Sequence, residues 1–193
     1  MASASAPGDV TRLLRAWRDG SGEAESELWR LLYDELRALA HGVLRRRGRG
    51  GRGQATSLVH KAYLRLLGSD VAWADRRHFF AVAARAMRFV LADEARRQLA
   101  KKRGAGPPPA LDSALPEVAD PLARRPEEVL AVHQALAKLA EIRPRHEKLV
   151  ELRYFAGLSV EETAEILELT PRTVVRDWKT VRTWLHGELE ATA

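Results

Sequence analysis

Residues 158–185, LSVEETAEILELTPRTVVRDWKTVRTWL, have the pattern of two helices joined by a tight turn, and this pattern strongly constrains the fold. Ser159, with Glu162 three residues later, forms a capping-box sequence at the start of the first helix. Thr170 can cap the second helix, and Pro171 suits its first turn, where no backbone donor is needed. The segment therefore predicts helix, turn and helix.

The second of these helices separates its residues by face. Its apolar residues recur at i, i+4, i+7 and i+11, as one stripe suited to packing: Val174, Trp178, Val181 and Leu185. The opposite face carries cations and a hydroxyl, namely Arg172, Arg176, Lys179 and Thr183. Such side chains suit phosphates and base edges in a major groove. A solvated amphipathic helix is the alternative, but the short preceding helix and the capped turn favour DNA binding.

The rest of the chain also has helical periodicity, and it has no alternating strand pattern of useful length. Helices are expected over about 9–17, 23–44, 76–102, 127–140 and 144–155, with a further one that Thr56 or Ser57 caps and that ends near 67. Prolines and glycines interrupt residues 104–126. We therefore expect an all-α protein with two helical domains, 9–103 and 127–189, joined by a flexible linker, 104–126, that can span up to about 75 Å.

Charge is distributed unevenly along the 193 residues. Residues 1–126 hold 23 basic and 14 acidic side chains, whereas the remainder holds 9 and 12. A polyanionic partner of the first half would account for this asymmetry. Cations are densest towards the end of the expected helix 76–102, and Trp73, Phe79 and Phe80 lie near its start. Cations beside aromatic rings suit a single-stranded nucleic acid, although core packing is the simpler explanation for Phe79 and Phe80.

Several function classes lack their sequence signals. The chain has no cysteine, its six histidines form no i, i+4 pair, and no HExxH, P-loop or GxSxG motif occurs. Gly48, Gly50 and Gly53 match a dinucleotide fingerprint in spacing only, because an arginine-rich helix end precedes them instead of a strand. No apolar run approaches the roughly 20 residues of a membrane helix. We expect a non-enzymatic, cytoplasmic protein with no cofactor, no metal and no membrane contact.

Taken together, the two halves resemble the bacterial sigma factors of the extracytoplasmic-function (ECF) class over about residues 9–189. Residues 56–66, TSLVHKAYLRL, resemble the region 2 helix that grips the clamp of RNA polymerase. Residues 76–104, RRHFFAVAARAMRFVLADEARRQLAKKRG, resemble the part that melts and reads the minus-10 element. Residues 145–185 resemble region 4, which reads the minus-35 element. Glu168 stands where the helix-turn-helix usually has glycine, which implies a different turn or a strained positive φ.

The resemblance implies a promoter-specificity subunit whose partners are core RNA polymerase (clamp and flap), promoter DNA and, where one exists, an anti-sigma factor. It assigns the minus-35 contacts to Arg172, Thr173, Arg176, Lys179 and Thr183. It assigns the minus-10 contacts to Arg85, Met87, Arg88, Arg96, Arg97 and Lys101. It assigns the polymerase contacts to Leu58, Lys61, Leu64 and Arg65. The alternative is a free-standing helix-turn-helix regulator that binds duplex DNA as a dimer.

Overall fold

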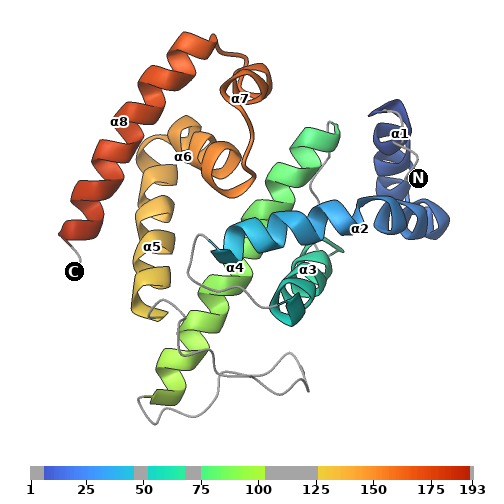
Figure 1. Ribbon diagram of the computed structural model, residues 1–193, viewed down its shortest axis with the longest axis horizontal. Coiled ribbons are helices and arrows are strands. Elements are labelled where there is room, and N and C mark those ends of the chain that lie inside the picture. The colour runs from blue at the N-terminus through green and yellow to red at the C-terminus, as the bar shows by residue number, and fades with distance from the viewer. Residues whose placement is uncertain (1–6, 46–51, 68–74, 103–125, 192–193) are drawn as a thin grey trace.

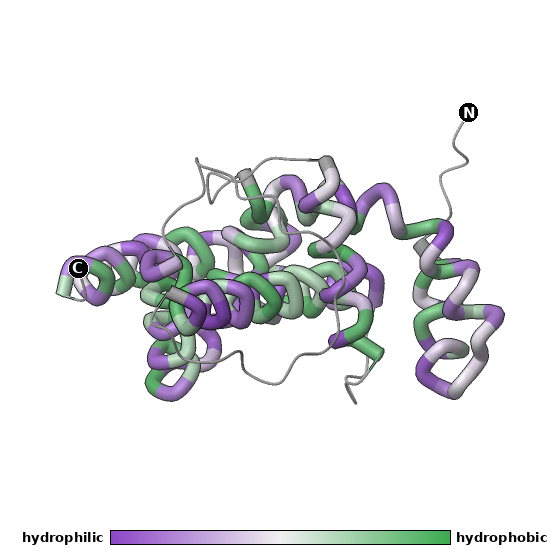
Figure 2. Tube along the Cα trace, turned by 90° about the horizontal axis from the view of Figure 1, so that it is seen from below, coloured by the Kyte–Doolittle hydropathy of each residue, from purple (hydrophilic) through white to green (hydrophobic). Residues whose placement is uncertain are grey.

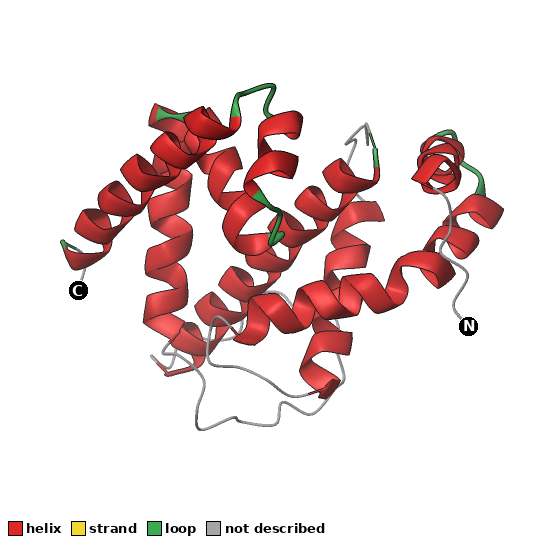
Figure 3. Ribbon diagram, turned by 45° about the horizontal axis from the view of Figure 1, so that its top comes forward, coloured by secondary structure: helices red, strands yellow, loops and turns green. Residues whose placement is uncertain are grey.

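The computed structural model describes residues 7–45, 52–67, 75–102 and 126–191. Every regular element within these ranges is a helix, and no strand occurs among them (Figure 3). The all-α class that the sequence predicts is therefore confirmed. Trp73, the glycine-rich segment 46–51 and the linker residues 104–125 lie outside the described residues.

The described residues of the first half form four helices: α1 (Pro7–Arg18), α2 (Gly22–Arg45), α3 (Arg52–Leu67) and α4 (Arg76–Lys102). The predicted cap at Thr56 or Ser57 is wrong, because α3 begins at Arg52 and includes both residues. Ala55 is fully buried in the core, so the packing of the extra turn outweighs the local capping preference.

The second half forms α5 (Pro126–Ile142), α6 (Pro144–Val150), the π-helical turn η1 (Glu151–Phe155), α7 (Val160–Ile166) and α8 (Pro171–Glu190). The sequence predicts one helix over 144–155, and α6 continues into η1 without a break. The last turn is wider than an α-helical turn, because the Ala156 N–H donates to the Glu151 carbonyl, five residues back, at 2.8 Å.

Helix α4 lies between the two halves (Figure 1). On one side it contacts α1, α2 and α3, and on the other it contacts α5 and η1, while α8 packs on α5, α6 and α7. Each helix presents hydrophobic and hydrophilic residues side by side along its length (Figure 2). None of the described helices is long and apolar enough to cross a membrane.

The two halves share one hydrophobic core. Met87 of α4, Leu136 of α5 and Val174 of α8 are fully buried, and all three belong to the same cluster as Leu14 and Leu32 of the first half. The sequence predicts two domains joined by a flexible linker, and the structure packs the second half directly against α4. Division into independent domains stays a prediction.

Candidate nucleic-acid interface

The turn between α7 and α8 is built from local hydrogen bonds that the sequence predicts. The Ser159 hydroxyl accepts from the Glu162 N–H at 3.1 Å, and the Glu162 carboxylate accepts from the Ser159 N–H at 2.8 Å. This confirms the capping box. At α8, the Thr170 hydroxyl accepts from the Thr173 N–H at 3.2 Å, and Pro171 occupies the first turn. Both caps fix where α8 begins relative to α7.

Glu168 adopts a left-handed conformation in this turn, with φ +54°. Its N–H donates to the Glu165 carbonyl at 3.3 Å, and the Leu169 N–H donates to the Ala164 carbonyl at 2.8 Å. This pair of bonds is the Schellman motif, which satisfies carbonyl groups at a helix end. The position normally favours glycine, so Glu168 costs roughly 1 kcal/mol of conformational energy there. The strained alternative of the sequence analysis is the one that occurs.

The inner face of α8 packs as its periodicity predicts. Val174 and Val181 are buried, and Trp178 and Leu185 are partly buried against the same core. Asp177 is also buried, which the apolar pattern did not indicate. Its carboxylate accepts from Arg145 of α6 at 2.9 Å and from Arg176 at 3.1 Å. Asp177 thus ties α8 to α6 and orients Arg176 at the surface.

The outer face of α8 is exposed and cationic. Its exposed residues include the predicted Arg172, Arg176, Lys179 and Thr183. Among the described residues, neither Arg172 nor Lys179 has an ion-pair partner. Thr173 is half-buried, and its hydroxyl lies 2.9 Å from that of Thr170. The Thr183 hydroxyl donates to the Lys179 carbonyl at 3.2 Å.

Val175 belongs to the same outer face, although the sequence analysis did not single it out. It is 56% exposed and lies between the exposed Arg172 and Arg176. An apolar side chain among cations suits the methyl group of thymine in a major groove. The sequence indicates this position by helical spacing, because Val175 follows Arg172 by three residues and precedes Lys179 by four.

The predicted minus-10 residues of α4 divide into two sets. Arg85, Arg96 and Lys101 are exposed and Arg97 is half-buried, with Arg96 donating to Asp93 at 2.6 Å and Arg97 to the Asp93 carbonyl at 3.4 Å. Met87 and Arg88, by contrast, are 0% and 2% exposed. His133 of α5, Glu147 of α6 and Glu151 of η1 cover Arg88, and Met87 is enclosed in the core, so neither residue lies on the surface that the sequence predicts.

Arg88 lies at the centre of a buried polar group, the Arg88 cluster, which consists of Arg88, His133, Glu147 and Glu151. The guanidinium donates to Glu151 Oε1 at 2.6 Å, to Glu147 Oε1 at 3.2 Å and to His133 Nδ1 at 2.9 Å. A guanidinium only donates, so His133 accepts through Nδ1 and is neutral in this arrangement. His133 lies on the buried face of α5 and is 6% exposed.

The Arg88 cluster has two carboxylates for one guanidinium. Burial raises the pKa of Glu151 to about 7; the positive charge of Arg88 opposes this rise and Glu147 adds to it. Glu151 Oε2 is buried and has no hydrogen-bond partner. A clue in the sequence was Arg88 itself, a cation inside the apolar run from Ala86 to Leu91.

The predicted polymerase residues of α3 also differ in exposure. Leu58 is buried at 3%, whereas Leu64 is 50% exposed, next to Leu67 at 46%. Lys61 donates to Glu94 of α4 at 2.7 Å, and Arg65 donates to Asp93 at 2.9 Å. The outer surface of α3 therefore carries two exposed leucines, Leu64 and Leu67, beside two cations that pair with carboxylates of α4.

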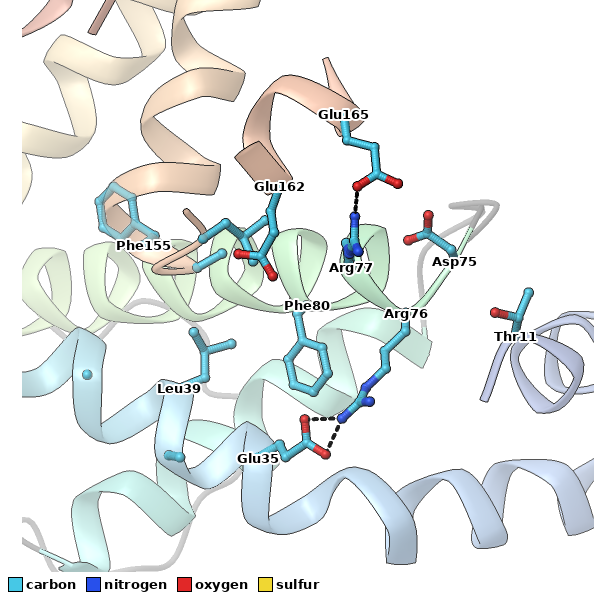
Figure 4. A pocket seen from close by; sticks show the side chains of 14 residues that line it. Thr11, Glu35, Leu39, Asp75, Arg76, Arg77, Phe80, Phe155, Glu162 and Glu165 are labelled. Carbon is cyan, nitrogen blue, oxygen red and sulfur yellow. Dashed lines mark hydrogen bonds and ion pairs between the residues drawn. The ribbon is translucent and has the colours of Figure 1, made fainter. Parts of the chain in front are cut away.

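A cleft of about 810 Å³ opens where α2 and the start of α4 face η1 and α7. Arg76 donates to both carboxylate oxygens of Glu35, and Arg77 donates to Glu165 (Figure 4). Phe80 and Phe155 also line the cleft. Both of its arginines are paired with carboxylates, and the Arg77–Glu165 pair joins the two halves across the cleft.

Comparison with known proteins decides the identity of this chain. The family model described as ECF sigma factor matches residues 7–191, almost the whole sequence. The chain belongs to the ECF sigma factor family. A search of curated proteins gave no match.

Membership of this family gives the chain its function. Like other sigma factors, this one directs RNA polymerase to promoters and takes part in transcription initiation; its partners are core polymerase and promoter DNA. The helical fold, the cationic outer face of α8 and the basic first half agree with that function. The match does not assign individual residues to the DNA or to the polymerase.

Proposed function

We propose that α7 and α8 form the helix-turn-helix that reads the minus-35 duplex, with the outer face of α8 in the major groove. The observation that carries this proposal is the exposure of Arg172 and Lys179 without an ion-pair partner among the described residues. Such cations lose no internal contact when they meet phosphates or guanine edges. Arg176, oriented by Asp177, is the third base-reading or phosphate-binding cation.

The two threonines have supporting roles in this proposal. Thr173 is engaged with the helix cap, so it positions the start of α8 while its oxygen remains able to accept a bond from DNA. Thr183 lies nearly three turns further along, where the helix is expected to leave the groove and approach the phosphate backbone.

For the minus-10 element, we propose that α4 captures the opened strand. Arg96, Arg97 and Lys101 follow the backbone, and Arg85, Met87 and Arg88 meet the bases. Extruding a base costs a few kcal/mol of stacking energy, which a fitting pocket offsets. Arg88 can take this role only after the second half of the chain moves away from α4, and Met87 only after it leaves the core.

For the polymerase, we propose that the exposed surface of α3 contacts the clamp. Leu64 and Leu67 supply apolar area, and Lys61 and Arg65 border it. Leu58 supports the surface from the core and does not itself reach a partner. Contacts with the flap of the polymerase and with an anti-sigma factor remain predictions from the family resemblance.

The test is transcription by purified bacterial core polymerase from a pool of genomic DNA fragments, with sequencing of the RNA 5′ ends. We expect the chain to produce discrete start sites that share two upstream motifs. Arg172→Ala with Lys179→Ala should abolish this selectivity and leave core binding intact, whereas Arg12→Ala, an exposed cation of α1, serves as the matched control. Binding of a symmetric operator by the chain alone, without polymerase, would instead support the regulator.

A further inference from the structure

We propose that the free chain occupies a closed state, in which the Arg88 cluster holds α5, α6 and η1 over the segment 85–89 of α4, and that the chain must open to work on a promoter. The closed state itself follows from the contacts between the two halves. Its consequence for transcription rests on the proposed role of α4 in reading the minus-10 element.

The first observation is the burial of the segment that α4 would offer to nucleic acid. Arg88 is 2% exposed, and the carboxylates that cover it come from α6 and η1, 59 and 63 residues away in the chain. Glu147 also lies 3.9 Å from Arg85. These carboxylates occupy the places at which phosphates would meet the two arginines, so the closed state and a strand bound at this segment exclude each other.

The second observation is the chemistry of the contact. An interface meant to stay closed would favour apolar side chains, because a buried ion pair seldom adds stability over a hydrophobic replacement. Here two carboxylates, a guanidinium and an imidazole meet at the boundary, and Glu151 Oε2 is buried without a partner. All of these groups regain water when the halves separate, which lowers the cost of opening. Contacts of this polar kind are typical of interfaces that form and break.

The third observation is a weaker contact at the far end of the same boundary. Arg77, near the start of α4, donates to Glu165 of α7 across the cleft (Figure 4). The side chain of Arg77 is 41% exposed and that of Glu165 is 69% exposed. An exposed ion pair adds little stability, but this one lies where a covalent link would fix the two halves together.

Opening can be measured directly because the chain has no cysteine. Spin labels on Ser26→Cys of α2 and His186→Cys of α8, both exposed positions, report the distance between the halves by pulsed electron resonance. We expect one narrow distance distribution in the free protein. Glu147→Gln with Glu151→Gln should broaden it, while Glu23→Gln with Glu161→Gln, two exposed carboxylates, should not. A broad distribution in the unsubstituted protein, or no change in the Glu147/Glu151 variant with its helix content intact, would overturn the closed state.

A covalent lock provides a second test that does not depend on the folding of that variant. Arg77→Cys with Glu165→Cys can be joined by a short, cleavable bis-maleimide and compared with the same variant left unlinked. On a promoter found by 5′-end sequencing, the linked form should lose most of its initiation, and cleavage should restore it. Equal initiation by the linked and unlinked forms would overturn the proposal.

The gain in DNA affinity expected from weakening the closed state has a lower limit. If the open form is populated at roughly 10% or less, the Glu147/Glu151 variant should bind a forked promoter fragment, with its minus-10 strand single, roughly tenfold more tightly or better. The proposed function and the proposed closed state are tested by different results. Absence of promoter-directed RNA from every form would remove the proposed function, whereas the distance measurement judges the closed state without polymerase.

Discussion

The guanidinium of Arg88 in α4 donates to the Glu151 carboxylate in η1 at 2.6 Å, and the two residues stand 63 positions apart. This bond connects the two halves of the sigma factor through groups that are almost completely buried. Removing one member of such a pair leaves an uncompensated charge in the core, which is more costly than removing both.

Arg88→Met should therefore lower the free energy of unfolding by up to about 3–5 kcal/mol, because Glu147 and Glu151 then remain buried without a cation. Urea unfolding followed by circular dichroism measures the loss. Adding Glu147→Gln and Glu151→Gln to this variant should recover part of it. Arg96→Met, which removes an exposed arginine of the same helix, should change stability by less than about 1 kcal/mol.

The stability of the closed state should depend on pH through Glu151. Its pKa is raised to about 7, so between the ordinary value of 4.5 and about 7 the folded chain binds more protons than the unfolded chain. The contribution of Glu151 to the free energy of unfolding is fully present below about pH 4.5. It declines as pH rises through 7, by up to about 3 kcal/mol in total.

Comparison with Glu151→Gln isolates this dependence, because the groups around Glu151 also carry charge. Arg88, Glu147 and His133 face it directly, and Arg85 lies beside Glu147. Burial lowers the pKa of the nearby His146, which gives a dependence of opposite sign at acidic pH. The difference in unfolding free energy between the two proteins should change from pH 5 to about pH 7 and level off at higher pH; a constant difference over that range would contradict the assignment.

Glu168→Gly should stabilise the turn between α7 and α8. Glu168 has φ +54°, a conformation that glycine adopts without strain, so the substitution should add about 1 kcal/mol despite the greater freedom of glycine in the unfolded chain. Thermal unfolding monitors the gain as a higher Tm. Glu161→Gly, at an exposed position inside α7, is the matched control and should lower stability by about 1 kcal/mol.

Val175→Ala should weaken promoter recognition at thymine. Val175 is 56% exposed between Arg172 and Arg176, and loss of its methyl groups removes an apolar contact worth roughly 1 kcal/mol. The measurement replaces each minus-35 thymine with uracil, which lacks the methyl group. One such replacement should weaken binding of the unsubstituted protein and leave the Val175→Ala variant unaffected. Additive effects of the two changes at every position would place Val175 away from the bases.

The local features of this sigma factor can be predicted from its sequence because their causes are close in the chain. Ser159 and Glu162 define one helix start, Thr170 and Pro171 define the next, and the stripe from Val174 to Val181 defines the buried face of α8. The start of α3 could not be predicted from local capping preferences, because Ala55 is buried in the core and capping rules do not account for such packing.

The closed arrangement could not be predicted, because it depends on contacts across the linker. Arg88 has the same sequence character as Arg85 and Arg96, yet it alone of these three is buried. Its partners Glu147 and Glu151 look like ordinary surface carboxylates until α6 and η1 are placed against α4. Charge and periodicity identified the cations of α4 without showing which of them the second half would cover.

The π-helical turn η1 has a geometric consequence for the Arg88 cluster. In an α-helix, side chains four residues apart drift by about 40° around the axis, so Glu147, Glu151 and Phe155 would rotate progressively away from a common direction. A π turn winds less per residue and reverses this drift over its last step. Phe155 consequently returns to the direction of the two carboxylates, and its ring lies 5.9 Å from the Arg88 guanidinium.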